Sequence, residues 1–358
     1  MYVPMKTRYE QDLRLFEHAG SAGAYALLAL AVLLAPALLG EYVLSQLSFV
    51  AIYAIAGVGM MLLIGYAGQI SLGHAAFLAV GAYTEAILQA RGVPFAVSLP
   101  AAGAVAGALS LLLAWSTARL AGIYLAMGTL AFAFVVEELL MRWESVTGGN
   151  HGLAVDAIVL GRLTLGAEWQ FYYLCVAVLA VVLLAAANLL RSRSGRALRA
   201  IRDSEVSAQS LGIHLARYKS AVLAASALLT GLAGALYAHK IAFVTPDQFT
   251  IMSSVELLVL VVVGGLGSLH GAVLGAAFIV MLPQLVIVLR DWIGFSSTLQ
   301  AGLDAGVYGL LMVLFMLFEP RGLYGRWVRI KTYLDLFPFY RRGSFRRQRL
   351  YHKSEQLR

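Results

Sequence analysis

Polar side chains and glycines interrupt the apolar sequence at residues 65–74, and this stretch holds the first candidates for chemistry. It reads Gly65-Tyr66-Ala67-Gly68-Gln69-Ile70-Ser71-Leu72-Gly73-His74. Each glycine costs a helix about 1 kcal/mol relative to alanine, so the pattern predicts a helix break. Broken helices within a membrane occur where the backbone lines a cavity, and in transporters they often hold the solute. An ordinary short cytoplasmic turn is the alternative.

A second interruption resembles the first. It reads Gly264-Gly265-Leu266-Gly267-Ser268-Leu269-His270-Gly271, so that Ser268-Leu269 matches Ser71-Leu72. Paired interruptions in two halves of a chain indicate a pathway between structural repeats. We therefore expect Gln69, Ser71, His74 and Ser268 to line a translocation pathway. Neither histidine has a carboxylate or thiol at ligand spacing, so we expect no metal and no cofactor.

A basic stretch at residues 195–205 predicts a docking surface. Its sequence is Gly195-Arg196-Ala197-Leu198-Arg199-Ala200-Ile201-Arg202-Asp203-Ser204-Glu205. On a helix, Leu198 and Ile201 share one face, and the three arginines form a stripe. Gly212 would end such a helix. We expect one short amphipathic helix that contacts a partner through Arg196, Arg199, Ile201, Arg202, Asp203 and Glu205. The alternative is a solvated basic loop that only sets topology.

Acidic residues fall within apolar runs, and we consider Glu137, Glu138, Glu256 and Asp304 as candidates. A charge at the centre of a bilayer costs about 2.5–3.5 kcal/mol on insertion scales, so such residues usually face a cavity or a partner. In the topology predicted below, all four lie within about 8 Å of an outer helix end at 1.5 Å per residue. We hypothesise that Glu256 borders the outer pathway and meets a substrate ammonium. Interhelical polar packing is the alternative.

The elements that must position these residues are membrane-spanning helices. The chain has 358 residues, of which 60% are hydrophobic and 13% charged, whereas soluble domains have about 25% charged residues. A spanning helix needs about 20 apolar residues. We therefore predict an all-α polytopic membrane protein with eight to ten transmembrane helices and broken or re-entrant segments near 65–74 and 262–271. The candidate runs are 24–40, 43–64, 74–90, 96–117, 120–141, 170–190, 220–238, 252–268, 271–289 and 300–318.

The basic residues predict the orientation. With ten crossings and both termini in the cytoplasm, 22 of the 27 Lys and Arg residues fall on the cytoplasmic side, as the positive-inside rule requires. This gives a cytoplasmic segment 1–23, a transmembrane domain 24–320 with a cytoplasmic loop 191–219 and an outer loop 142–169, and a basic cytoplasmic tail 321–358. The high pI thus marks faces near anionic lipid rather than nucleic-acid binding. The tail is expected to lie on the membrane surface or to be disordered.

Other function classes lack their sequence signatures. No phosphate-binding Gly-Lys-Ser/Thr loop occurs, so the chain is not expected to bind ATP in that way. No His-Glu-x-x-His motif, Gly-x-Ser-x-Gly elbow or midplane Asp pair indicates an enzyme. An ion-coupled secondary transporter would need buried carboxylates near the middle of a span, and a channel would need a filter repeat.

Six blocks in sequence order together resemble the LivM-type permeases of branched-chain amino acid ABC importers. These blocks are GYAGQISLGHAAFLAVGAY, RLAGIYLAMGTLAFAF, TGGNHGL, the GRALRAIRDSE loop, VELLVLVVVGGLGSLHGAVLGA, and Glu319-Pro320-Arg321-Gly322-Leu323. The resemblance covers residues 50 to 325, and the long basic, aromatic tail departs from it.

The resemblance implies a multi-pass subunit of the bacterial inner (plasma) membrane. Its implied partners are a paralogous LivH-type permease, two ATP-binding subunits and a periplasmic solute-binding protein. It also implies that residues 195–212 form the coupling helix against an ATP-binding subunit. The implied substrates are branched-chain or other hydrophobic amino acids, although similar permeases serve urea, short amides and aromatic acids.

Overall fold

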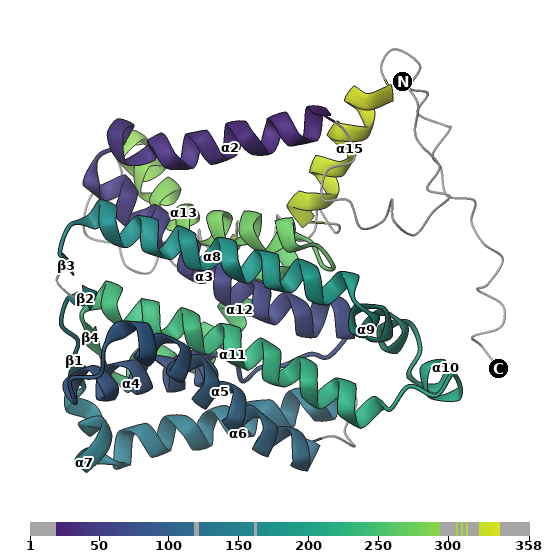
Figure 1. Ribbon diagram of the computed structural model, residues 1–358, viewed down its shortest axis with the longest axis horizontal. Coiled ribbons are helices and arrows are strands. Elements are labelled where there is room, and N and C mark those ends of the chain that lie inside the picture. The colour runs from purple at the N-terminus through teal and green to yellow at the C-terminus, as the bar shows by residue number, and fades with distance from the viewer. Residues whose placement is uncertain are drawn as a thin grey trace.

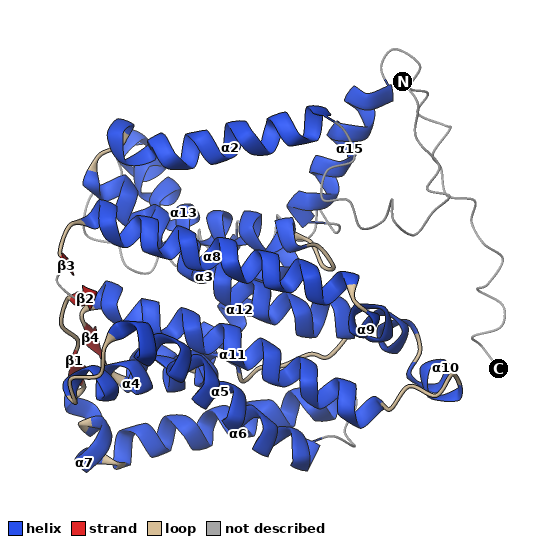
Figure 2. Cartoon of the chain, viewed as in Figure 1, coloured by secondary structure: helices blue, strands red, loops and turns tan. Residues whose placement is uncertain are grey.

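The computed structural model describes residues 19–117, 122–160, 163–293 and 322–336, with a few helical positions between 306 and 313. Helices dominate this part of the chain (Figure 2). The long helices are α2 (Ala19–Leu38), α3 (Glu41–Met60), α4 (His74–Ala90), α5 (Phe95–Thr117), α6 (Ile123–Arg142), α8 (Glu168–Arg191), α11 (Leu215–Ile241), α12 (Ile251–Gly264), α13 (Leu269–Ile293) and α15 (Gly322–Leu336). The short ones are η1 (Met61–Tyr66), α7 (Glu144–Thr147), η2 (Gly149–His151), α9 (Arg193–Asp203), α10 (Glu205–Ser210) and η3 (Pro246–Phe249).

The long helices form one bundle in which α2, α5, α6, α8 and α11 run roughly parallel or antiparallel (Figure 1). One end of the bundle carries α9 and α10, and the opposite end carries the short strands and α7. Within the described residues, six segments are long and apolar enough to cross a membrane: Glu41–Tyr66, Phe95–Trp115, Ile123–Arg142, Glu168–Arg191, Leu215–Ile241 and Pro246–Gly264. The predicted helical, multi-pass architecture is therefore confirmed.

Helix α11 lies at the centre of the core and packs closely on α3, α4 and α5. Glycine makes this approach possible. A Cβ atom at Gly81 would overlap the backbone of Gly231, and one at Gly234 would overlap the carbonyl of Leu78. In the same way Gly103 and Gly107 of α5 lie against α11. Such small-residue contacts are the usual means by which membrane helices pack.

Four short strands cap the end of the bundle opposite α9, a feature that the all-helical prediction did not include. β1 (Leu153–Ala154) pairs antiparallel with β4 (Phe243–Val244), with Leu153 opposite Val244. β2 (Ile158–Leu160) pairs antiparallel with β3 (Leu163–Leu165). The β1–β4 pair ties the segment between α6 and α8 to the segment that follows α11, whereas β2 and β3 form a local hairpin before α8.

Candidate functional site

The first predicted break lies inside the bundle. Helix α3 ends in the π-helical turn η1, and residues 68–73 then run back into the bundle without regular structure before α4 begins at His74 (Figure 2). The hydroxyl of Ser254 in α12 accepts a hydrogen bond from the Ala75 amide at 2.9 Å. From Ser254 to the end of α12 at Gly264, the rise is about 15 Å at 1.5 Å per residue. Helix α4 therefore begins about 15 Å from the end of α12, inside the bundle.

A buried hydrogen-bond network fixes the start of α4. His74 has no exposed surface, and both of its ring nitrogens have serine partners. Nδ1 lies 2.9 Å from the Ser71 hydroxyl, and Nε2 lies 2.7 Å from the Ser226 hydroxyl near the middle of α11. Thr129 of α6 accepts a hydrogen bond from the Leu72 amide at 3.0 Å. The network thus joins the break to α6, α11 and α12.

The side chains of residues 67–73 alternate between the interior and the open face of the bundle. Gln69, Ser71 and Gly73 are buried, whereas Gly68 and Ile70 are exposed and Leu72 is partly exposed. Such alternation is typical of an extended backbone. The predicted polar residues therefore point inward and hold the break in place, and the open face of the segment is mainly apolar, with Ile70 44% exposed.

The second predicted break lies elsewhere. Helix α12 ends at Gly264 and α13 begins at Leu269, at the α9 end of the bundle. Ser268 caps α13, because its hydroxyl accepts a hydrogen bond from the Gly271 amide at 3.2 Å. The amide of Gly267 donates to the sulfur of Met61 at 3.2 Å. The structure therefore brings Ser71 and His74 together but leaves Ser268 in a separate turn.

Arg202 of α9 lies between the two breaks. Its guanidinium donates a hydrogen bond to the carbonyl oxygen of Gly65, at the end of η1. A Cβ atom at Gly267 would lie 3.0 Å from Nη1 of Arg202, and one at Gly68 would lie 3.3 Å from its Cγ. One turn earlier, the Arg199 guanidinium lies 5.7 Å from the centre of the Tyr66 ring, a cation–π contact. Helix α9 thus touches both breaks.

The basic segment forms two helices rather than the single helix predicted. Helix α9 ends at Asp203, and Ser204 then caps α10 by accepting a hydrogen bond from the Ser207 amide at 3.3 Å. Serine competes with helix continuation in this way because its side chain bonds the backbone locally. As predicted, Leu198 and Ile201 are buried together.

The polar side chains of this helix pair divide between solvent and the bundle. Arg196, Arg199, Arg202 and Asp203 are exposed. Glu205 forms an ion pair with Lys219 of α11 at 2.7 Å. Helices α9 and α10 are therefore held to the bundle on one side and exposed to solvent on the other.

Two exposed apolar residues in and directly after α10 were not identified from the sequence. Val206 of α10 is 80% exposed, and Leu211, which follows it, is 78% exposed. Exposed apolar side chains at the tip of a projecting polar segment are typical of a protein contact. The signal was present in the sequence, because both interrupt an otherwise polar stretch.

Glu256 is partly buried and lies two residues after Ser254, whose hydroxyl contacts the start of α4. The predicted run 252–268 is found as the apolar segment Pro246–Gly264, because η3 already runs into the bundle beside Tyr83 of α4, whose ring lies 6.3 Å from that of Phe249. Glu256 therefore lies nearer the middle of this segment than of the predicted run. A half-buried carboxylate at this depth needs a cavity or a partner.

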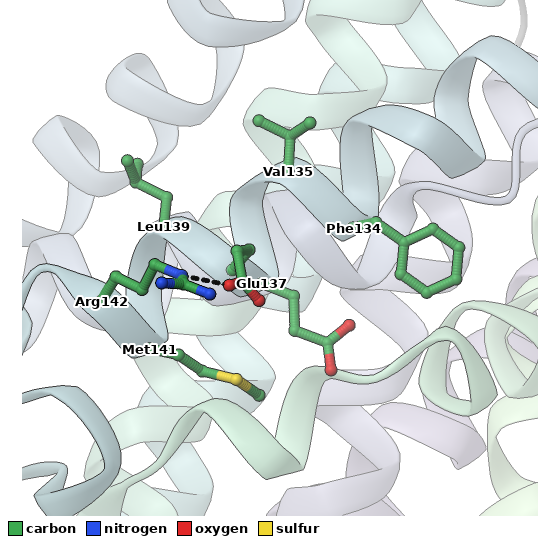
Figure 3. Close-up of a pocket in the computed structure, with 7 residues that line it drawn as sticks. Phe134, Val135, Glu137, Leu139, Met141 and Arg142 are labelled. Carbon is green, nitrogen blue, oxygen red and sulfur yellow. Dashed lines mark hydrogen bonds and ion pairs between the residues drawn. The ribbon is translucent and has the colours of Figure 1, made fainter.

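The other acidic candidates lie near the strand-bearing end or outside the described residues. Glu138 pairs with Arg142 on the surface of α6, beside an open hollow lined by Phe134 and Met141 (Figure 3). Glu137 lines the same hollow and points away from Arg142. Asp304 lies outside the described residues.

A buried carboxylate near that end was missed. Glu85 of α4 has no exposed surface, and its Oε1 accepts a hydrogen bond from Ser98 of α5 at 2.6 Å and lies 3.0 Å from Nε2 of His239. His239 Nδ1 lies 3.1 Å from the Asp156 carbonyl oxygen. The cluster joins α4, α5, α11 and the segment before β2. An acidic residue inside the apolar run 74–90 was the available signal.

Comparison with known proteins identifies the family. Residues 42–316 match the family model described as "Branched-chain amino acid transport system / permease component". The chain is 35% identical over 297 residues to the high-affinity branched-chain amino acid transport system permease protein LivM of Salmonella typhimurium, covering 76% of this chain and 67% of the relative. It is 26% identical over 292 residues to the permease protein LivH of Escherichia coli, covering 76% and 91%. It is also 30% identical over 204 residues to the autoinducer 2 import system permease protein LsrC of an Enterobacter strain, covering 53% and 54%.

Proposed function

Because the chain belongs to the permease-component family of branched-chain amino acid transport systems, we propose that it forms one half of the translocation pathway of an ATP-driven importer. As a member of this family it is a transport subunit and not an enzyme. The proposed cargo is a branched-chain or other hydrophobic amino acid, and the apolar open face at Ile70 supports this choice. Urea, an amide or an aromatic acid is the alternative cargo.

One observation carries the ATP-driven mechanism, namely the contact of Arg202 with the Gly65 carbonyl. A motor that docks on α9 and α10 can act directly on the end of η1 through this side chain. The proposed ATPase contacts are Arg196, Arg199, Ile201, Arg202, Asp203 and Glu205, with Val206 and Leu211 as the apolar anchors. Ile201 acts from the buried side of α9, because it is 2% exposed.

The proposed assembly has further subunits. The chain has relatives named LivM and other relatives named LivH, and this supports a paralogous permease as the second half of the pathway. This chain has no phosphate-binding loop of its own, so two ATP-binding subunits would supply the energy. They would dock at the α9 end. A periplasmic solute-binding protein would deliver cargo to the strand-bearing end.

We further propose ten crossings with both termini in the cytoplasm of a bacterium. Six segments have the length and composition of full spans. Helices α2, α4 and α13 and the run 300–318 would supply the others, with α4 beginning in mid-membrane. The basic helices α9 and α15 would then face the cytoplasm, in agreement with the positive-inside rule.

The proposed pathway runs along the open face of residues 67–73, between α6 and α12. In this proposal Gln69, Ser71 and His74 set the position of the break, and Ser268 fixes the cytoplasmic turn. Glu256 is the proposed contact for a substrate ammonium, because it lies on α12 at the depth where α4 begins. A carboxylate at this depth also suits an ion-coupled carrier, which the experiment below must therefore exclude.

The deciding experiment combines co-purification with uptake. The double variant Val206→Asp/Leu211→Asp should abolish co-purification of the ATP-binding subunits, whereas Gln209→Asp, which adds a charge at an exposed polar position of the same helix, should retain it. In proteoliposomes loaded with the whole assembly, leucine uptake should require both the binding protein and internal ATP. Uptake by this chain alone, driven by a proton or sodium gradient, would refute the proposal.

A further inference from the structure

Helix α15 differs from the spanning helices in direction and in composition. It crosses the α9 end of the bundle at a steep angle to α2, α8 and α11 (Figure 1). From Arg326 to Lys331 every side chain is exposed, and Tyr333 is exposed as well. Trp327 is 59% exposed and Ile330 48%. A helix across the bundle end with this many exposed aromatic and apolar side chains needs a partially apolar environment.

The charges of this helix indicate what that environment is. Arg326, Arg329 and Lys331 alternate with Trp327, Val328 and Ile330, and Asp335 is the only acidic residue of α15. Interleaved basic and aromatic residues match the boundary between headgroups and acyl chains, where tryptophan, tyrosine and long cationic side chains concentrate. A basic helix in this plane attracts anionic headgroups.

The base of α15 is fixed to the second break. Gly322 has a φ of 68°, and a Cβ atom there would lie 2.6 Å from the backbone of Gly265. The ring of Tyr324 stacks on His270 of α13 with 5.8 Å between the centroids and 7° between the planes. His270 Nε2 lies 2.5 Å from the Tyr25 hydroxyl of α2. A change in the position of α15 is therefore transmitted to the α12–α13 turn, which Arg202 also approaches.

We propose that α15 is a docking helix for anionic phospholipid, and that its base couples the lipid surface to the turn between α12 and α13. This goes beyond the proposed import function, since it assigns a ligand class to a surface that does not contact the cargo. The basic side chains supply the attraction, and Trp327 and Ile330 supply the insertion into the acyl boundary.

The test measures the immersion of α15 directly. A spin label is attached to the cysteine introduced by Ile330→Cys. The native buried thiol is removed by Cys175→Ala, so that the label can react at residue 330 alone. The full chain is incorporated into nanodiscs of phosphatidylcholine alone or with phosphatidylglycerol, and collision with oxygen and with a nickel chelate gives the depth of the label. Phosphatidylglycerol should move the label into the acyl region. Each basic residue should contribute about fivefold to the docked fraction, which corresponds to ~1 kcal/mol.

Two variants separate charge from folding. Arg326→Gln/Arg329→Gln/Lys331→Gln should lose the response to phosphatidylglycerol, whereas Arg326→Lys/Arg329→Lys should keep it. A label equally immersed in both lipids, or equally exposed to water in both, would overturn the proposal. So would immobilisation that appears only when ATP-binding subunits are added, because α15 would then be a protein contact. None of these readings depends on transport, so they stand apart from any failure of the import function.

Discussion

Replacing Arg202 by methionine should uncouple ATP hydrolysis from transport. Methionine keeps much of the aliphatic length of the side chain but removes the guanidinium that donates to the Gly65 carbonyl and lies beside Gly267. Helix α9 would keep its buried contacts through Leu198 and Ile201. The other residues of the docking surface would therefore keep their positions, while the link from α9 to both breaks is lost.

The size of the effect follows from the bond that is removed. A hydrogen bond that involves a charged group contributes about 1.5–3 kcal/mol, and Arg202 is partly open to solvent, so the lower figure applies. A free-energy difference of about 1.4 kcal/mol changes an equilibrium constant tenfold. Loss of this bond therefore shifts the equilibrium between the state with the Arg202–Gly65 contact and a state without it roughly tenfold. We expect solute transported per ATP hydrolysed to fall by about that factor.

The assay uses proteoliposomes that contain the complete importer with its binding protein. Leucine uptake and phosphate release are measured in the same vesicles for wild type, Arg202→Met, and the control Arg193→Met. Arg193 is exposed on the first turn of the same helix, so the control removes a charge without touching either break. Only Arg202→Met should lower the ratio of transport to hydrolysis. Unchanged coupling, or a parallel loss of both activities with the ATPase subunits dissociated, would refute the reasoning.

Three further predictions concern the interior of the bundle. Ser226→Ala should lower the thermal stability of the purified permease by about 1–3 kcal/mol of unfolding free energy, because the buried His74 Nε2 loses its partner; a melting temperature equal to wild type would contradict the network. Gly234→Ala should destabilise by about 1–3 kcal/mol, because the new Cβ meets the Leu78 carbonyl, whereas Gly23→Ala, where no atom lies within 4 Å, should be tolerated. Glu256→Gln should raise the KM for uptake if the carboxylate meets the substrate ammonium; unchanged kinetics in a normally assembled importer would remove Glu256 from the pathway.

The sequence predicts the helices and the positions of both breaks, since these depend on local composition. Apolar runs near 20 residues need lipid around them, and the glycines of residues 65–73 and 264–271 weaken any helix there. The predicted run 43–64 is found as Glu41–Tyr66. The same local reasoning places Leu198 and Ile201 on the buried face of α9.

The missing parts depend on contacts distant in sequence. Ser226 lies 152 residues from His74, and Ser254 lies 179 residues from Ala75. Serine within an apolar helix gives no local sign of which residue it will meet. The likeness of Ser71-Leu72 to Ser268-Leu269 also misled the site prediction, because similar glycine-rich sequences lie at different depths. One enters the bundle, and the other turns at its end.

The contacts of α11 and of the first break indicate where a push on α9 would act first. Helix α11 is held by glycine contacts with α4, in which backbone meets backbone, and by contacts of Gly103 and Gly107 in α5 with its backbone and leucine side chains. Packed interfaces of this kind shift between discrete positions rather than deform. Residues 68–73 lack regular structure, and they are anchored by the hydrogen bonds around Ser71, His74 and Thr129 and by the close approach of Gly73 to the Thr129 carbonyl. A push on α9 reaches this segment through Arg202 and Gly65 before it reaches α11. The break, and not the central helix, is therefore the element that a motor at the α9 end would move first.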